Sequence, residues 1–358
     1  MKVPATFSAP SIGPRRSSRC FLSRVCLLWI FVFGPYSTVS NAQDAIVLVG
    51  SGSSVPAPLY SRWSAEYNKR NPARQFRYLP IGTSEGVKQI LRGSGDFGAG
   101  EAPLTASEQA EASLAEFPTV MIAIVPYYHL PGSHQELRFT GDLLAQIFLG
   151  EIKRWNDPQI TKLNPNASLP DVPIKIFYRP TGKGTNYVFS DFLSKSSSKF
   201  RTRIGTSPSP KWPVGEPAER SSDMADKVKG ETGSIGYGEL QYAIKGDIAY
   251  GQVQNPAGNF IKASPETIAA ACKAVEAPGW DKFAVTLTNA SGAESYPVTS
   301  FTWFYVRTGI SDVRRASALE DFLNWVYTDG QQIAVKEGYS ELPPPLLAAV
   351  RKKVKDLH

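Results

Sequence analysis

Three times in this chain, an apolar strand pattern runs into small, hydroxyl-rich residues and then into a helical pattern. These small-residue loops span residues 50–54, 81–86 and 179–185. A helix N-terminus leaves up to about four backbone amides without partners and carries roughly half a positive charge. Glycine lets the backbone approach a ligand closely, and Ser or Thr adds a hydroxyl donor. One such loop is more often an ordinary helix cap, but three together predict a site for a small oxyanion that needs no metal.

The order of the strand and helix patterns predicts an α/β fold. Strands and helices alternate from residue 44 onward, which indicates a mostly parallel sheet with ligands at the carboxyl ends of its strands. A second unit begins after about residue 128, and a Pro- and Gly-rich stretch at 205–220 is expected to be a long loop. The expected strands are 45–49, 75–81, 96–99, 119–126, 174–179, 234–238, 248–253 and 296–306, and the clearest helices are 58–70, 87–92, 140–150 and 316–327.

The first 42 residues are typical of a secretory signal peptide. They hold five basic residues and no acidic one, and they lead through the apolar run 25–33 to a polar tail that ends at Ala42. A membrane-spanning helix needs roughly 20 apolar residues, and this run has only nine. We therefore expect the segment to be cleaved and not to anchor the chain in a membrane. Neither Cys20 nor Cys26 lies in a lipoprotein-type cleavage context. The sequence therefore predicts an exported protein.

Charge and cysteine content narrow the class further. The whole chain has 39 Lys+Arg and 32 Asp+Glu, and without residues 1–42 these counts become 34 and 32. Such a near-neutral chain does not indicate nucleic-acid binding, and we expect the basic cluster 351–355 to be a solvated tail. Cys272, the only cysteine left, is expected to be buried in a helix. The few histidines are scattered, so the sequence predicts no metal and no other cofactor.

The three loops and the segments between them resemble the periplasmic phosphate-binding proteins of bacterial phosphate ABC importers. Segment 50–60, which reads GSGSSVPAPLY, is similar to that family's opening G-x-G-x-[ST]-x-P-x-P-x-Y motif. Further segments follow in the family's order over nearly the whole mature chain, at 81–90, 96–104, 147–157, 179–185, 233–237 and 296–298. The resemblance implies a two-lobed, type II periplasmic-binding fold, in which two mixed, mostly parallel sheets are flanked by helices and a central cleft closes on one phosphate.

Lobe boundaries are also implied by the resemblance. Lobe 1 would comprise residues 43–127 together with 299–358, and lobe 2 would comprise residues 128–298. The hinge would lie near 126–128 and 298–300, and the closed form is what a transporter would recognise.

Eight positions of the chain correspond to the family's phosphate-binding residues. Neutral donors around one delocalised cation suit a desolvated anion. The donors are Ser54, Val55, Thr83, Gly184 and Thr185, the cation is Arg179, and the two remaining positions, Glu101 and Lys183, depart from the family's usual residues.

Glu101 stands where the family usually has an Asp whose carboxylate accepts a hydrogen bond from the ligand's proton. Fully ionised sulfate offers no such proton, and a site that depends on a ligand hydroxyl can reject the analogue lacking it by about 10⁴–10⁵. Thr181 replaces an acidic residue and Lys183 a serine, so both changes make the site more positive. Three hypotheses follow. Lys183 pairs with Glu101, or it points out of the cleft and contributes only its amide, or the site holds a more highly charged or esterified phosphate.

The leading interpretation is a monomeric binding protein that hands phosphate to an ABC permease at the inner membrane, with a cytoplasmic ATPase behind it. A phosphatase would need a nucleophile with a general base, or a metal pair. Ser53 and Ser54 lack the G-x-S-x-G spacing, and His129 and His134 lie in a Pro/Gly loop without an evident acidic partner. We therefore expect no enzyme. Two alternatives stay open: the same fold with another ligand, such as sulfate, tungstate or an organophosphate, and a phosphate sensor or scavenger without a dedicated permease.

Overall fold

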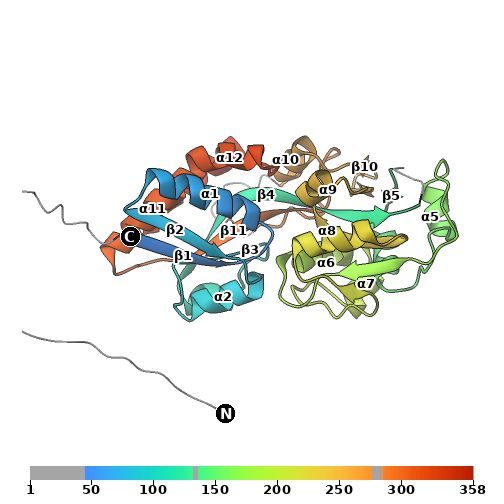
Figure 1. The fold of residues 1–358 in the computed structure, drawn as a ribbon, viewed down its shortest axis with the longest axis horizontal. Helices are drawn as coiled ribbons and strands as arrows, with labels where there is room; N and C mark the ends of the chain where they lie inside the picture. Colours follow the sequence, from blue (N-terminus) through green and yellow to red (C-terminus); the bar gives the residue numbers. More distant parts are fainter. Residues whose placement is uncertain (1–44, 132–135, 276–282, 284, 358) are drawn as a thin grey trace, which may run out of the picture. The chain divides into compact units, whose positions relative to one another are not determined.

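Eight strands in the order β2-β1-β3-β11-β4-β8-β6-β7 form the sheet that carries the fold. The computed structural model describes residues 45–131, 136–275, 283 and 285–357 (Figure 1). The predicted signal peptide and His134 lie outside these ranges. None of the helices in the described residues is both long and apolar enough to cross a membrane.

Strand pairing is mixed and mostly parallel, as predicted. At one end, β1 (Ile46–Gly52) runs parallel to β2 (Arg74–Leu79) and β3 (Phe97–Gly100). At the other end, β6 (Lys175–Tyr178) runs parallel to β7 (Glu216–Pro217) and β8 (Ser234–Glu239). Between them, β11 (Thr299–Arg307) is antiparallel to both of its neighbours. A separate small sheet contains β5 (Arg138–Phe139), β9 (Gln252–Gln254) and β10 (Phe260–Ile261).

One long strand, β4 (Leu114–His129), joins the two expected sheets into one. Its residues 114–123 pair with β11 and its residues 124–129 pair with β8. All but the last residue of β4 is buried, which explains the continuous apolar run that identified it in the sequence. The lobe boundaries stay a prediction, and the change of partner at 123/124 lies close to the hinge expected at 126–128.

Helices cover both faces of the β1–β2–β3 strands, with α1 and α11 on one side and α2 on the other (Figure 1). The helices are α1 (Ala57–Arg70), α2 (Thr83–Leu91), α3 (Ala106–Glu111), α4 (Gly141–Phe148), α5 (Pro158–Leu163), α6 (Gly184–Ser196), α7 (Ser198–Arg203), α8 (Ser221–Gly230), α9 (Leu240–Gly246), α10 (Pro265–Ala274), α11 (Val313–Trp325), α12 (Gln331–Lys336) and α13 (Pro344–Val354), with a π-helical turn at Val326–Gly330 and a 3₁₀ turn at Lys355–Leu357.

Most predicted elements are confirmed to within a few residues. The predicted helix 316–327 begins earlier, as α11, and the predicted strand 248–253 is only partly formed, as β9. Cys272 is buried on α10, as expected. Trp212, in the predicted loop 205–220, packs its ring against Phe148, Phe189 and Tyr237. These aromatic contacts of Trp212 attach the loop to the core.

The predicted solvated basic tail at 351–355 is confirmed only in part. Arg351, Lys352 and Lys355 are exposed, but the segment forms the end of α13 and the turn after it. Leu346, Val350 and Val354 of α13 are buried. Their spacing of four residues gives the helix an apolar stripe that the density of basic residues concealed. The Lys353 ammonium lies 4.7 Å from the centroid of the Phe283 ring, and burial lowers the pKa of Lys353.

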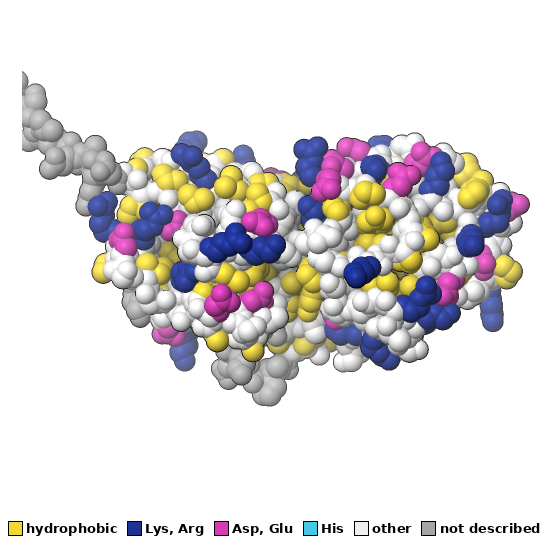
Figure 2. All heavy atoms as spheres, turned by 90° about the horizontal axis from the view of Figure 1, so that it is seen from below, with side chains coloured by type: hydrophobic (Ala, Val, Ile, Leu, Met, Phe, Trp, Pro, Cys, Tyr) yellow, Lys and Arg dark blue, Asp and Glu magenta, His cyan; other side chains and the backbone are white. Residues whose placement is uncertain are grey.

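On the face shown in Figure 2, basic and acidic side chains are both scattered, and neither sign covers the whole face. This agrees with the near-neutral charge expected after residue 42.

Candidate functional site

Close backbone packing accounts for the glycines of the first two loops. A side chain at Gly52 would place its Cβ 2.0 Å from the Ala99 carbonyl oxygen. Gly82 is the N-cap of α2 and has a φ of 103°, in the region that favours glycine. Its amide donates to the Gly52 carbonyl (2.7 Å), so the first loop is tied directly to the second.

Glu101 is the buried acid of the site. It follows β3 immediately and is fully inaccessible to solvent. Its Oε2 accepts a hydrogen bond from Thr83 Oγ1 (3.2 Å), while its Oε1 has no partner. Burial raises the pKa of Glu101 to about 8, against the lowering effects of the Ser53 and Thr83 hydroxyls and the Arg179 charge. A carboxyl with this pKa is largely protonated at neutral pH.

Gly184 brings the third loop against this acid. It is the first residue of α6, and a Cβ built on it would lie 1.8 Å from Glu101 Oε2 and 2.7 Å from Thr83 Oγ1. Only a residue without a side chain allows so close an approach. The backbone at the start of α6, the Thr83 hydroxyl and the Glu101 carboxyl therefore meet at one point.

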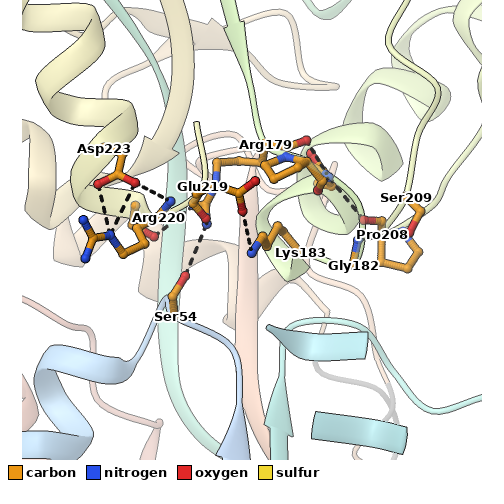
Figure 3. A network of polar contacts seen from close by, with 12 residues as sticks. Ser54, Arg179, Gly182, Lys183, Pro208, Ser209, Glu219, Arg220 and Asp223 are labelled. Atoms are coloured by element: carbon orange, nitrogen blue, oxygen red, sulfur yellow. Dashed lines mark hydrogen bonds and ion pairs between the residues drawn. The ribbon is translucent and has the colours of Figure 1, made fainter. Parts of the chain in front are cut away.

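Arg179 joins the first loop to the third. It follows β6, and it is 1% exposed. Its Nη2 donates to Ser54 Oγ (3.2 Å) and to the Glu219 carbonyl (3.0 Å), and its Nη1 donates to Ser221 Oγ (3.0 Å). Figure 3 shows the guanidinium between Ser54 and the segment that contains Glu219. Its Nε is buried without a partner, so one donor of the fixed fork remains available.

Thr185 connects to two residues that the sequence reasoning missed. Its hydroxyl donates to Glu239 Oε1 (3.1 Å), which also accepts from Ser221 Oγ (3.0 Å). Glu239 ends β8 and Ser221 begins α8, and both are buried. A signal was present in the sequence, since Glu239 directly follows the strand predicted at 234–238, at the edge where ligands were expected.

Val55 and Lys183 differ from their predicted roles in this structure. The Val55 amide donates to Ser53 Oγ (3.1 Å), and the Lys183 amide donates to the Pro208 carbonyl (3.1 Å). Lys183 Nζ lies 3.5 Å from Glu219 Oε2 (Figure 3). The hypothesis that Lys183 pairs with Glu101 was therefore wrong, and its amide already has a protein acceptor. Glu219 is close because the chain turns from β7 into α8 beside the third loop.

The loop 205–220 holds the third small-residue loop in shape. The Gly182 amide donates to the Pro208 carbonyl (2.9 Å) and to Ser209 Oγ (3.0 Å). Asn186 Nδ2 donates to the carbonyls of Arg179, Pro180 and Pro208. Asn186 is another residue that the sequence reasoning missed, because buried amides of this kind leave no pattern in a single sequence.

Known proteins match this chain over most of its length. A family model described as PBP superfamily domain matches residues 39–330. The phosphate-binding protein PstS of Xylella fastidiosa (strain 9a5c) is 36% identical over 323 residues, which cover 88% of each chain. The phosphate-binding protein PstS of Pasteurella multocida (strain Pm70) is 32% identical over 335 residues, or 93% of this chain and 96% of that protein.

Solved structures share the fold at lower identity. A high-affinity periplasmic phosphate-binding protein (PfluDING) bound with phosphate superposes with a TM-score of 0.69 at 19% identity, covering 86% of this chain and 93% of that one. An ABC-type phosphate transport receptor from Vibrio cholerae gives a TM-score of 0.56 at 17% identity, covering 83% and 100%. The chain therefore belongs to the PBP superfamily and, within it, to the family of PstS phosphate-binding proteins. The predicted type II periplasmic-binding fold is confirmed.

Proposed function

We propose that this protein captures inorganic phosphate between its three small-residue loops and delivers it to the permease of an ABC transporter. The observation that carries the proposal is the meeting of Arg179, Glu101 and the N-terminus of α6 at one buried place. Relatives named phosphate-binding protein PstS, at 36% and 32% identity, support the same ligand.

The donors for the ligand come from groups that the protein leaves without acceptors. Among the described residues, the backbone amides of Thr83, Gly184 and Thr185 donate to no protein atom, and Arg179 Nε is likewise free. Amides at a helix N-terminus and a guanidinium are strong, preorganised donors to an oxyanion. Ser54 adds a hydroxyl, while the Thr83 hydroxyl donates to Glu101 and joins the set only if it exchanges that partner for the ligand. The Val55 amide and Lys183 belong to the proposed set only if ligand binding changes the partners they have here.

Glu101 supplies the selectivity for a protonated anion. In its ionised form, its unpartnered Oε1 is a buried acceptor that a ligand hydroxyl would satisfy, so binding of a protonated anion favours ionisation of Glu101. Against the ionised carboxylate, fully ionised sulfate brings only acceptors and would leave two oxygens facing each other in a dry site, which is strongly unfavourable. Sulfate and organophosphates remain the alternative ligands.

The cleft would close by movement of lobe 1 (43–127 with 299–358) toward lobe 2 (128–298). Contacts between these two parts include the Ser54–Arg179 hydrogen bond and the Ser84 amide donating to the Gly182 carbonyl (3.2 Å). Both join residues of the binding loops, so the ligand and the closed arrangement would stabilise each other.

Delivery implies export and a membrane partner. The N-terminal segment 1–42 would direct the chain to the periplasm and be removed there, and the mature protein would act as a monomer. The loaded form would dock on an inner-membrane permease driven by a cytoplasmic ATPase. The proposal includes no catalytic step. Separately, among the described residues no group of three or more His, Cys, Asp or Glu could hold a metal ion.

Phosphate uptake by cells tests the proposal. In its own host, deleting the gene should abolish high-affinity uptake of radiolabelled phosphate, and the wild-type gene should restore it. An Arg179→Ala variant exported to the same level should not restore uptake. Normal uptake by the deletion strain, or full restoration by Arg179→Ala, would contradict the proposal.

A further inference from the structure

The side chain of Glu239 points away from the helix that this residue precedes. It is the N-cap residue of α9, yet its side chain makes no capping hydrogen bond to that helix. The carboxylate turns instead toward Thr185, the second residue of α6, and Ser221, the first residue of α8. Because helix N-termini are positive, this convergence stabilises a negative charge that is fully buried.

Arg179 and Glu239 are linked through one hydroxyl. Arg179 Nη1 donates to Ser221 Oγ (3.0 Å), and Ser221 Oγ donates to Glu239 Oε1 (3.0 Å). Within the described ranges, neither Arg179 nor Glu239 forms a direct ion pair, so each has its counter-charge one hydroxyl away, across Ser221. A buried ion requires such compensation.

The same carboxylate oxygen also fixes Thr185. It accepts a hydrogen bond from the Thr185 hydroxyl (3.1 Å) and thereby sets the rotamer of the residue whose amide is free for a ligand. One oxygen thus holds two separate parts of the proposed phosphate site, the guanidinium through Ser221 and the start of α6 through Thr185.

We propose that Glu239 is a positioning residue for oxyanion binding, which holds Arg179, through Ser221, and Thr185 in the geometry that receives the ligand. This inference rests on the proposed function. It assigns Glu239 no contact with the ligand. Its charge alone would oppose an anion, so positioning and charge have opposite effects on affinity.

Phosphate titration calorimetry of ligand-stripped residues 43–358 tests this with Glu239→Gln, Ser221→Ala and the double variant. Glu239→Gln should weaken phosphate binding about 10- to 100-fold, the range carried by hydrogen bonds to a charged group. Ser221→Ala should weaken it less. Glu239→Gln should reduce phosphate affinity clearly less when it is introduced into Ser221→Ala than when it is introduced into the wild type, because part of its effect passes through Ser221. If the substitutions acted only by disturbing the fold, they would lower thermal stability, and their effects on phosphate affinity would be additive.

Glu116→Gln is the matched control. Glu116 is also a buried carboxylate, but it accepts hydrogen bonds from the Leu104 amide and from Gln109, outside the site. This variant should bind phosphate within about twofold of the wild type.

Unchanged or tighter binding by Glu239→Gln would overturn the inference. If that variant does not fold, Ser221→Ala decides, and wild-type affinity in that variant would overturn it equally. Absence of phosphate binding by the wild-type protein would instead remove the proposed function itself, so the two failures are distinguishable.

Discussion

The α-carbon of Gly184 lies directly against the carboxyl group of Glu101, so closely that a Cβ would fall 1.8 Å from Oε2. This contact joins the start of α6 to the end of β3, two segments that are about eighty residues apart in the sequence. It makes the absence of a side chain at residue 184 a condition of the closed site.

Gly184→Ala should therefore weaken phosphate binding by at least about tenfold, because the methyl group separates α6 from Glu101 and Thr83. Calorimetry on the stripped protein measures the loss. Gly230→Ala is its control, since nothing lies within 4 Å of the added methyl there, and it should leave the affinity unchanged. Equal affinity of Gly184→Ala and the wild type would contradict the geometry of the site.

Arg179→Lys should lose phosphate affinity by about 100-fold or more. An ammonium cannot reproduce the fork that contacts Ser54, Ser221 and the Glu219 carbonyl from two nitrogens. The neighbouring Arg220 is exposed and pairs with Asp223, so Arg220→Lys should change little. A small effect of Arg179→Lys would show that the site needs only a positive charge.

Lys183→Ala should reduce phosphate affinity by less than about tenfold. The Lys183 amide is bound to Pro208 and its ammonium pairs with Glu219, whose side chain is 70% exposed, and such pairs contribute little. Titration at low and high salt measures the effect. A loss above about 100-fold would show that Lys183 contacts the ligand and would restore its predicted role.

The buried carboxyl of Glu101 should make the unfolding free energy depend on pH. Burial raises its pKa in the folded protein to about 8, above that of the unfolded chain, so the folded state binds more protons between the two pKa values. Its stabilising contribution is then complete below the unfolded pKa and is lost as the pH rises toward 8. Urea unfolding of the stripped protein from pH 5 to 9 should show a decline on the order of 1 kcal/mol per pH unit. Glu101→Gln should flatten this decline, and an identical slope in both proteins would contradict the shift.

Much of the fold could be predicted from the sequence, because its signals are local. The apolar run at 119–126 identified the core of β4, and the glycine loops located the starts of α2 and α6. The continuity of the sheet through β4 could not be predicted, because strand pairing depends on partners far away in the chain. Likewise, the apolar stripe of α13 was hidden by the basic residues between its buried positions.

The candidate site was predictable at the level of its loops and less so at the level of its contacts. Ser54, Thr83, Glu101, Arg179, Gly184 and Thr185 lie together in the structure. The partner of Lys183 could not be predicted, because Glu219 comes from a turn with no sequence pattern. Glu239 and Ser221 were missed because each acts through tertiary hydrogen bonds.

Binding of a protonated phosphate and rejection of sulfate depend on the same group, the ionised Glu101 carboxylate. Calorimetry of ligand-stripped protein with phosphate, and separately with sulfate, from pH 5 to 9 measures both. We expect tight phosphate binding, and no detectable heat from sulfate at the upper end of this range, where Glu101 is ionised. Sulfate binding comparable to phosphate binding there, or no binding of phosphate, would contradict this expectation.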